Sequence, residues 1–414
     1  MIKIRKTAQI YILLLFLLFL LIPIKCKAFY KPQGLVKVYS VVIIPPDPLD
    51  PSLIDGDFVP EYRGKTIEFV INKINLLTEQ GLNALSESTA YKKYSNSSST
   101  NYLFYNNIKT VTYIEPIKIG LQVLGKSTHN PDYIFYLNRE NICDLVDKQG
   151  ISEIWLWTNH NTIIEPTESN MSMGTSISEF WNYSDYGDVS NSKRTKDLPI
   201  CKNTYTLYNY SFTRALGELL ENHTHQIESI LKYIDLDLFW KNFAGVPDSG
   251  WSMPNNPGCG WTHFPPNGTK DYDWYSQTQV LNDCEDWNPQ KTGEKKLVNC
   301  STWSKDLTCP YDGGVAFKTW WMQNIPGLNN NFYYNGKKLR NWWEYIENFD
   351  KAIQQKSKLY QWTYGDFNND NTTNAVDTNL LVNAVLQINP KIFMDLNDDN
   401  VVNLPDLTEY LSNK

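Results

Sequence analysis

Oxygen-bearing side chains recur at a fixed spacing near the end of the chain, in two segments that begin at Asp366 and Asp395. Acidic or amide residues stand at positions 1, 3, 5, 9 and 12 of each segment, and position 7 can offer its backbone carbonyl. Calcium takes about six to eight oxygens at flexible geometry, and the clustered carboxylates would repel one another without a cation. The candidate ligands are Asp366, Asn368, Asp370, Thr372, Asn374 and Asp377, then Asp395, Asn397, Asp399, Val401, Asn403 and Asp406. We therefore expect two Ca²⁺ ions in these loops.

Both loops depart from the ordinary EF-hand at two positions. Position 6 holds Asn371 and Asn400 in place of glycine, and asparagine is the side chain that best tolerates the left-handed conformation. Position 12 is aspartate in place of glutamate, so its shorter arm predicts modest affinity or a tighter loop. Apolar residues spaced for a helix follow each loop, at 379–386 and 407–411.

The repeated sequences GDFNND at 365–370 and DLNDD at 395–399 resemble the type I dockerin repeat, over residues 364–411. The resemblance implies a cohesin partner within a polysaccharide-degrading assembly. In that family, loop positions 10 and 11 often carry a Ser-Thr contact pair. Here they are Ala-Val at 375–376 and Leu-Pro at 404–405, and the linker between the loops is short. A cohesin-like partner, docking on the protein's own body, and an unrelated partner all remain open.

A second constellation lies in the strongest helical pattern of the chain, within 205–234. Glu218, Glu221, His225 and Glu228 are three or four residues apart, so they share one helical face. A histidine flanked by carboxylates can bind a metal or transfer protons. The pattern is not the His-Glu-x-x-His of zinc peptidases. The alternative is an ion-paired solvent face, with His223 in the core.

A third constellation is the loop that carries His263, Asp271 and Asp273 among glycines, prolines and aromatic residues. Its polar side chains could be catalytic groups, and its aromatic rings could line the bottom of a pocket. Alternatively, the loop could be purely structural and held by disulfides. We select Glu221, His225, Glu228 and His263 as the candidate catalytic residues.

The body of the chain is similar to a group of secreted microbial proteins of uncharacterised function. The similarity rests on LLENHTHQIESIL at 219–231, CGWTHFPPN at 259–267 and DYDW at 271–274. It implies no activity. The sequence also lacks a Gly-x-Ser-x-Gly elbow, a phosphate-binding loop and a dinucleotide fingerprint.

The start of the chain has the pattern of a secretory signal peptide. Lys3, Arg5 and Lys6 precede an apolar run at 10–24, and the small residue Ala28 offers a cleavage site. The run is short for a bilayer span, although an uncleaved anchor is the alternative. We expect a secreted, extracellular protein without a stable membrane anchor after cleavage.

Six cysteines follow the expected signal peptide, and an even number in an oxidising compartment predicts disulfides. They are Cys143, Cys201, Cys259, Cys284, Cys300 and Cys309. Their pairing stays open, but the last four fall in a loop-rich region that bridges would staple. A zinc site using Cys259 and His263 is the less favoured alternative, because no Cys-x-x-Cys pair supports it.

The elements that must position these residues alternate between strand and helix. Strands are expected at 36–44, 108–114 and 151–158, the first and third of them buried, and helices at 65–79 and 138–148. A closing helix is expected at 341–355. This order predicts a mixed α/β fold with a largely parallel sheet, flanking helices and a long disulfide-stapled loop region, followed by a small all-α dockerin-like module. The domains are a signal peptide at 1–28, a body at 29–355, a linker at 356–363 and a calcium-binding module at 364–414.

Ligands of parallel sheets gather beyond the carboxyl ends of strands. The strands lead there to an acidic rim with one histidine, which could do acid–base work, hold a metal, or be a solvated loop. Its members are Asp47, Asp50, Asp55, Asp57, Glu115, Asn159, His160 and Glu165.

Charge and composition narrow the function. A net charge of −7 without a basic stripe makes nucleic acid a poor partner. Aromatic residues make up 14% of the chain, enough for a large core and for platforms that stack on sugars.

Two classes of function stay open. One is a secreted hydrolase acting on polysaccharide, with the tail as its tether. The other is a non-catalytic extracellular surface or matrix-binding protein with structural calcium.

Overall fold

The computed structural model describes residues 34–180, 188–192, 194, 196–246, 258–304, 309, 311–354, 358–361, 365–367, 372–386, 394 and 402–412. The expected signal peptide at 1–28 lies outside these residues. The chain divides after Gln33 into two units, and every described residue belongs to the second. Within the described part, none of the helices combines the length and apolar character needed to cross a membrane.

A five-stranded sheet organises the body, with the strand order β2-β1-β5-β7-β6. The first four strands are parallel and β6 runs antiparallel to β7, so the expected largely parallel sheet is confirmed. The strands are β1 (Gly34–Ile44), β2 (Leu103–Ile114), β5 (Glu153–Thr158), β6 (Ser169–Ser172) and β7 (Tyr205–Ser211). The central strands β5 and β7 are buried along their whole length, because helices cover both faces of the sheet.

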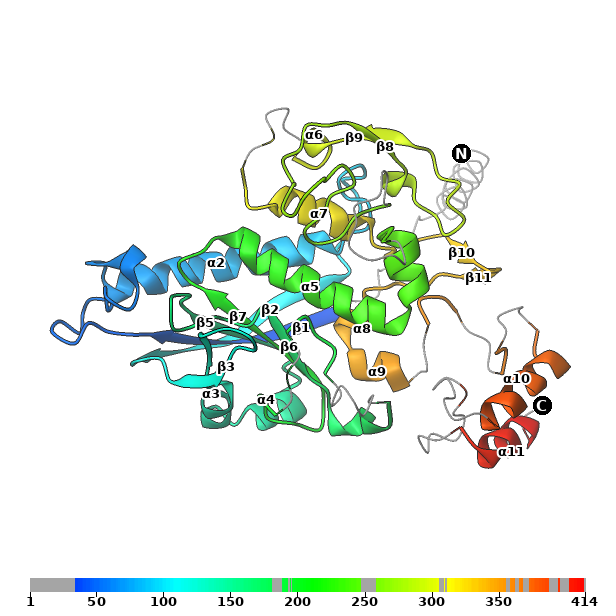
Figure 1. Ribbon diagram of the computed structural model, residues 1–414, viewed down its shortest axis with the longest axis horizontal. Helices are drawn as coiled ribbons and strands as arrows, with labels where there is room; N and C mark the ends of the chain where they lie inside the picture. Colours follow the sequence, from blue (N-terminus) through cyan, green and yellow to red (C-terminus); the bar gives the residue numbers. More distant parts are fainter. Residues whose placement is uncertain are drawn as a thin grey trace, which may run out of the picture. The chain divides into compact units, whose positions relative to one another are not determined.

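Alternate side chains of each strand build two separate cores. Val38 and Trp155 face α2 (Ile67–Ser88) and α5 (Leu216–Ile234), whereas Val41 faces the other side. There it packs with residues of α3 (Tyr133–Arg139) and α4 (Ile142–Gln149). Figure 1 shows α2 and α5 on one face of the sheet and α3 and α4 on the other. The body is thus a three-layer α/β arrangement, as two-faced burial of a parallel sheet requires.

Two elements differ from the sequence-based expectation for identifiable reasons. The helix expected at 65–79 continues through Gly81 to Ser88. A Cβ on Gly81 would lie 2.6 Å from Cδ1 of Leu219, so glycine serves close packing of α2 on α5 and does not end the helix. The first residues of 205–234 form β7, and the helix begins only at Leu216.

The helical region expected at 138–148 is two helices, α3 and α4, with Asn141 between them in the left-handed conformation. Gly150 ends α4 at φ 69°, as glycine after a helix predicts. The closing helix expected at 341–355 is likewise divided into α8 (Glu344–Glu347) and α9 (Phe349–Gln354).

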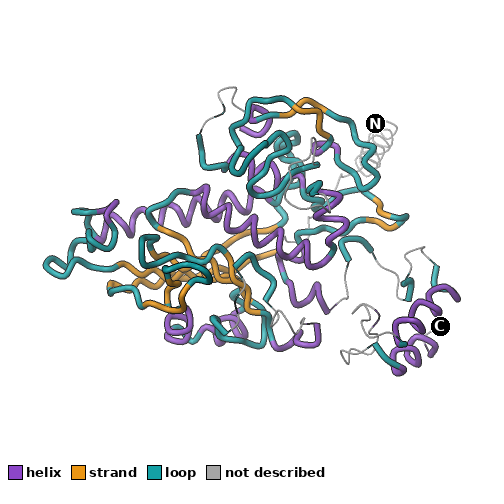
Figure 2. The backbone as a smooth tube through the Cα atoms, in the orientation of Figure 1, coloured by secondary structure: helices purple, strands orange, loops and turns teal. Residues whose placement is uncertain are grey.

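A long irregular region packs over α5 and α7 (Val315–Asn324). Figure 2 shows that it is mostly loop, with the short elements β8 (Val280–Asn282), β9 (Lys296–Val298) and α6 (Cys300–Ser304). Its two disulfides are Cys259–Cys284 and Cys300–Cys309, and a third bridge joins Cys143 to Cys201. The expected stapling is confirmed. Because Cys259 is in a disulfide, the zinc site that would use it is excluded.

Shorter elements complete the body. They are η1 (Pro60–Tyr62), β3 (Ile119–Gln122), β4 (His129–Pro131), η2 (Thr175–Phe180), η3 (Leu236–Phe243), η4 (Cys284–Asp286), β10 (Tyr333–Tyr334) and β11 (Lys337–Lys338).

The described part of the tail contains two helices, α10 (Ala375–Val385) and α11 (Leu404–Ser412). They share a small core of their own with Phe367, Leu381 and Tyr410 at its centre.

Candidate metal centre

The polar face of α5 meets the loop that carries His263. Glu221, His225 and Glu228 lie on successive turns of this helix, which presents its apolar residues to the sheet. The loop is fixed opposite them by the Cys259–Cys284 disulfide and by Trp321, whose Nε1 donates to the carbonyl of Gly260 at 2.9 Å. Because the helix packs on the sheet and the loop is held by these two contacts, the side chains between helix and loop have fixed positions.

Three side chains converge at this junction. The Nε2 atoms of His225 and His263 lie 3.0 Å apart, and Nε2 of His263 lies 3.1 Å from Oε1 of Glu221. One ligand atom from each residue falls within 4.8 Å of the other two. The three side chains are 11%, 18% and 16% exposed in the order His225, His263, Glu221. The cluster is therefore largely screened from water but still reachable.

These separations match the spacing of atoms that share one metal ion. Zinc binds histidine nitrogen and carboxylate oxygen at ~2.0–2.1 Å in tetrahedral geometry, which places neighbouring ligand atoms about 3.3 Å apart. Two imidazoles and one carboxylate are a donor set that suits zinc and neighbouring transition metals. Three protein ligands leave a fourth position open, which is the arrangement of catalytic sites.

The far nitrogen of each histidine faces a carboxylate. Nδ1 of His225 lies 3.5 Å from Glu228, and Nδ1 of His263 lies 3.3 Å from Asp271. Such carboxylate–histidine pairs orient imidazole ligands and fix the tautomer that points its other nitrogen at the metal. Glu228 is itself held by the backbone N–H and the hydroxyl of Thr262, at 2.6 and 2.7 Å.

The electrostatics of the pair on α5 follow from these contacts. Burial alone would raise the pKa of Glu228, but the contact with His225 holds it below its usual value. Burial would conversely lower the pKa of His225, and the neighbouring Glu228 carboxylate raises it. The carboxylate is therefore ionised and able to support a positive charge on or beyond the imidazole.

A buried lysine fixes the third member of the cluster. Nζ of Lys318 donates to Oε2 of Glu221 at 3.1 Å and to the carbonyls of Gly217 and Gly313 at 3.0 and 2.9 Å. Burial lowers the pKa of Lys318 to about 8. Burial alone would raise the pKa of Glu221, but the hydrogen bond from His263 and the charge of Lys318 lower it to about 2. Glu221 thus stands ionised with one oxygen anchored and the other turned to the histidines.

Two further carboxylates border the cluster. Oε2 of Glu168 lies 3.6 Å from Nε2 of His225, and its side chain is 40% exposed. Glu218, one turn before Glu221, pairs with Arg214 at 3.0 Å. Burial raises the pKa of Glu218 to about 7. Glu218 can therefore exchange a proton near the centre at neutral pH.

The structure brings together the four residues selected from the sequence, in two roles. Glu221, His225 and His263 offer ligand atoms, whereas Glu228 contacts Nδ1 of His225, the ring nitrogen that faces away from the cluster. His223 lies in the core, 1% exposed, as its place on the apolar stripe predicts. Lys318 and Glu168 were not anticipated. Lys318 sits in an aromatic helix with no charge pattern, and Glu168 directly precedes a strand that the sequence did not indicate.

The acidic rim beyond the strand ends does not form one centre among the described residues. Its groups are instead held locally, either by basic side chains or, for Asp47, Asp50 and Asp55, by backbone N–H groups of their own turns. The pairs are Asp57 with Arg63, Glu115 with Arg139, Glu165 with Lys126 and His160 with Arg214. The reading of this rim as a solvated surface therefore fits the geometry.

The expected calcium loops are described only in part. Asn368, Asp370, Asp395, Asn397, Asp399 and Val401 lie outside the described residues. Asp366, Asp377 and Asp406 are fully buried. Asp377 accepts the backbone N–H of Asn374 at 2.9 Å, and Asp406 accepts that of Asn403 at 2.7 Å, so the two loops repeat one contact. Asp366 also pairs with Lys337 of β11.

Comparison of the chain with protein-family models, with curated proteins and with solved structures finds no match.

Proposed function

We propose that the body is a metal-dependent hydrolase whose centre is formed by Glu221, His225 and His263. The observation that carries the proposal is the convergence of two imidazole nitrogens and one carboxylate oxygen at 3.0 and 3.1 Å. A carboxylate behind each histidine and a lysine behind the glutamate support it, because ligands oriented by such partners are typical of metal sites.

The residues around the centre would have different roles in hydrolysis. A bound metal ion would lower the pKa of a water molecule towards ~7 and so supply a nucleophile. Glu168 borders the cluster and is placed to accept a proton from that water. Glu228 and Asp271 hold the imidazoles, and Lys318 keeps Glu221 ionised and oriented.

Exposed aromatic rings beside the centre favour a polysaccharide substrate. The Tyr272 ring lies 4.3 Å from that of His263 and is 47% exposed. Tyr275 and Tyr311 pair at 4.5 Å, and Tyr311 is 89% exposed. Trp274 connects the two sets, at 5.3 Å from Tyr272 and 6.2 Å from Tyr275. Flat rings with a polar tip suit the apolar faces and hydroxyl edges of sugars.

The tail is proposed to be a dockerin-like calcium module that tethers the body. The two loops bury three carboxylates, those of Asp366, Asp377 and Asp406, and the Lys337 ammonium beside Asp366 adds one positive charge, so calcium would compensate the remaining negative charge. The tether would bind a cohesin-like partner or dock on the body itself, where Lys337 pairs with Asp366. Three disulfides fit an extracellular location for the whole protein.

Metal content and hydrolysis test the proposal together. Elemental analysis of the purified chain should find a transition metal that His225→Ala and His263→Ala lose and that the control His129→Ala retains. Hydrolysis of a polysaccharide panel should stop with a chelator and return with zinc. A chain that binds no transition metal would overturn the centre. Metal binding without hydrolysis of any polysaccharide would favour a non-catalytic surface protein.

A further inference from the structure

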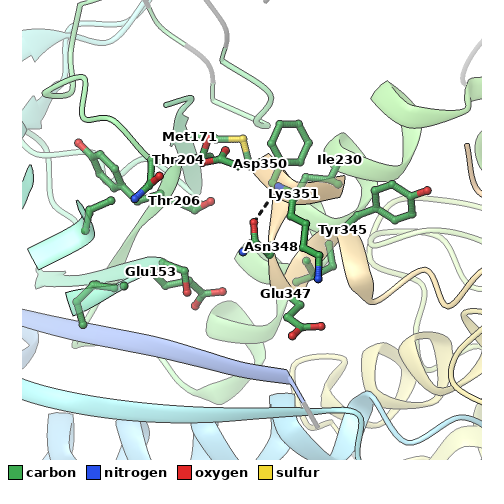
Figure 3. A pocket seen from close by; sticks show the side chains of 18 of the residues that line it. Glu153, Met171, Thr204, Thr206, Ile230, Tyr345, Glu347, Asn348, Asp350 and Lys351 are labelled. Atoms are coloured by element: carbon green, nitrogen blue, oxygen red, sulfur yellow. Dashed lines mark hydrogen bonds between the residues drawn. The ribbon is translucent and has the colours of Figure 1, made fainter. Parts of the chain in front are cut away.

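A second pocket lies on the other side of α5, at the opposite end of the sheet from the acidic rim. Its volume is about 510 Å³, within the ~300–1,000 Å³ range of small-molecule sites. Glu153 and Thr206, at the starts of β5 and β7, line one side, and α9 with the residue before it lines the other. Figure 3 shows Glu153 and Thr206 facing Asn348 and Lys351 across the opening.

Two tyrosine hydroxyls are open to this pocket. Tyr105 and Tyr208 line it, and within the described residues their hydroxyls make no hydrogen bond and are not among the fully buried polar atoms. These hydroxyls can therefore form hydrogen bonds with a ligand in the pocket.

Unused acceptors stand beside the hydroxyls. Oε1 of Gln226 and Oδ1 of Asp350 are buried without a partner among the described residues. Glu153 uses Oε2 for Trp155, at 2.9 Å, and for His223, at 3.2 Å, while none of the described residues donates to its Oε1. The pocket therefore presents the acceptor oxygens of Gln226 and Glu153, the Asp350 carboxyl group and two tyrosine hydroxyls, and it suits a ligand with both donors and acceptors.

The charges of the pocket argue for an uncharged ligand. Glu153 is stabilised by His223 and Trp155, and burial raises the pKa of Asp350, which favours its neutral form. The lysines that line the pocket, Lys202 and Lys351, are exposed. Among the described residues, no arginine lines the pocket to bind an anion.

We propose that this pocket binds a small neutral sugar, a mono- or disaccharide, at a site separate from the metal centre. The hydroxyls of Tyr105 and Tyr208, together with the carboxamide of Gln226, suit the hydroxyl edge of a sugar ring. The site does not depend on the hydrolase proposal, because helix positions 223, 226, 227 and 230 face the pocket while 221, 225 and 228 face the metal centre.

Binding to the chelated full chain tests the pocket without catalysis. The probes are glucose, galactose, mannose, xylose, N-acetylglucosamine and cellobiose, with glucuronate and 1,4-diaminobutane as charged comparisons. Saturation-transfer NMR identifies the binders, and calorimetry measures their affinity. We expect at least one neutral sugar to bind and both charged probes to fail.

Tyr105→Phe and Tyr208→Phe locate the site while keeping ring volume and removing only an unpaired hydroxyl. Each should weaken sugar binding about five- to tenfold, the value of one hydrogen bond, without lowering the melting temperature. The matched control is Tyr333→Phe, at an exposed ring of β10 that lines neither this pocket nor the metal centre, which should leave binding unchanged. Failure of every neutral sugar, binding of a charged probe alone, or sugar binding that ignores both pocket variants would overturn the proposal.

Discussion

The Nε2 atoms of His225 and His263 lie 3.0 Å apart, although the two residues are 38 positions apart in the chain. One histidine comes from a regular helix and the other from an irregular loop held by a disulfide. Each has a carboxylate at its far nitrogen, Glu228 for His225 and Asp271 for His263. Because each imidazole has its own carboxylate partner, the pair differs from a chance contact between two imidazoles.

Asp271→Asn should weaken metal binding without harming the fold. The carboxylate behind His263 is 59% exposed, so its loss leaves no buried charge, but the imidazole loses the partner that orients it. Loss of such a partner typically reduces metal affinity about 10–100-fold, and exposure places the expected effect at the lower end. Zinc titration by calorimetry measures the change, with Asp237→Asn as an exposed control. An unchanged zinc affinity would remove Asp271 from the centre.

Lys318→Met should strongly destabilise the chelated protein. Lys318 is fully buried, and its removal leaves Glu221 charged without its partner. Breaking a buried ion pair on one side costs about 3–5 kcal/mol. Adding Glu221→Gln to Lys318→Met should restore part of the free energy of unfolding, because the remaining charge is gone. Urea unfolding measures both variants, and a double variant no more stable than Lys318→Met would contradict the pairing.

Some residues of this site can be predicted from the sequence and others cannot, depending on whether local or long-range interactions determine their positions. The shared face of Glu221, His225 and Glu228 follows from the helical repeat alone. The approach of His263 does not, since it depends on a disulfide pairing that spacing cannot choose. Lys318 lies in a helix of aromatic residues, and its ammonium can be buried because it donates to the carbonyl of Gly217, 101 positions away, as well as to that of the nearby Gly313.

The same distinction applies to the fold. The strands around 36–44 and 151–158 were predictable because they are continuous apolar runs, the pattern of a doubly covered parallel sheet. No strand was predicted at β7, because its sequence mixes aromatic and polar residues and lacks the continuous apolar run of the other two strands. The pocket at the opposite end of the sheet was not anticipated, since its wall at 345–354 joins the strands only in three dimensions.

The stability of the metal-free protein should fall as pH rises from about 5 to 8, partly through Glu218. Burial raises the pKa of Glu218 to about 7, above its unfolded value, so the folded state holds an extra proton in this window. Stability therefore decreases with pH there, by at most about 3 kcal/mol. Glu218→Gln should flatten the dependence of melting temperature on pH, whereas Glu79→Gln should not. Parallel profiles for Glu218→Gln and the parent protein would exclude this group as the cause.

The three disulfides should contribute unequally to stability. In the chain-entropy account, stabilisation grows with the length of the closed loop. Cys143–Cys201 spans 58 positions and should contribute about 4 kcal/mol. Cys300–Cys309 spans 9 positions and should contribute about 3 kcal/mol. Paired serine variants, compared by urea unfolding under oxidising conditions, measure the order. A larger loss from the shorter bridge would mean that native contacts, and not loop closure, dominate.

Calcium added to the chelated protein should raise the melting temperature of the tail module. The carboxylates of Asp366, Asp377 and Asp406 are fully buried and Lys337 adds one positive charge beside Asp366, so a bound ion would compensate the remaining negative charge. Asp366→Ala should remove part of the calcium-dependent gain, and Asp406→Ala should remove another part through the second loop. His225→Ala should leave the gain intact, because its proposed metal lies in the body. A melting temperature that does not respond to calcium in the parent protein would refute the loop assignment.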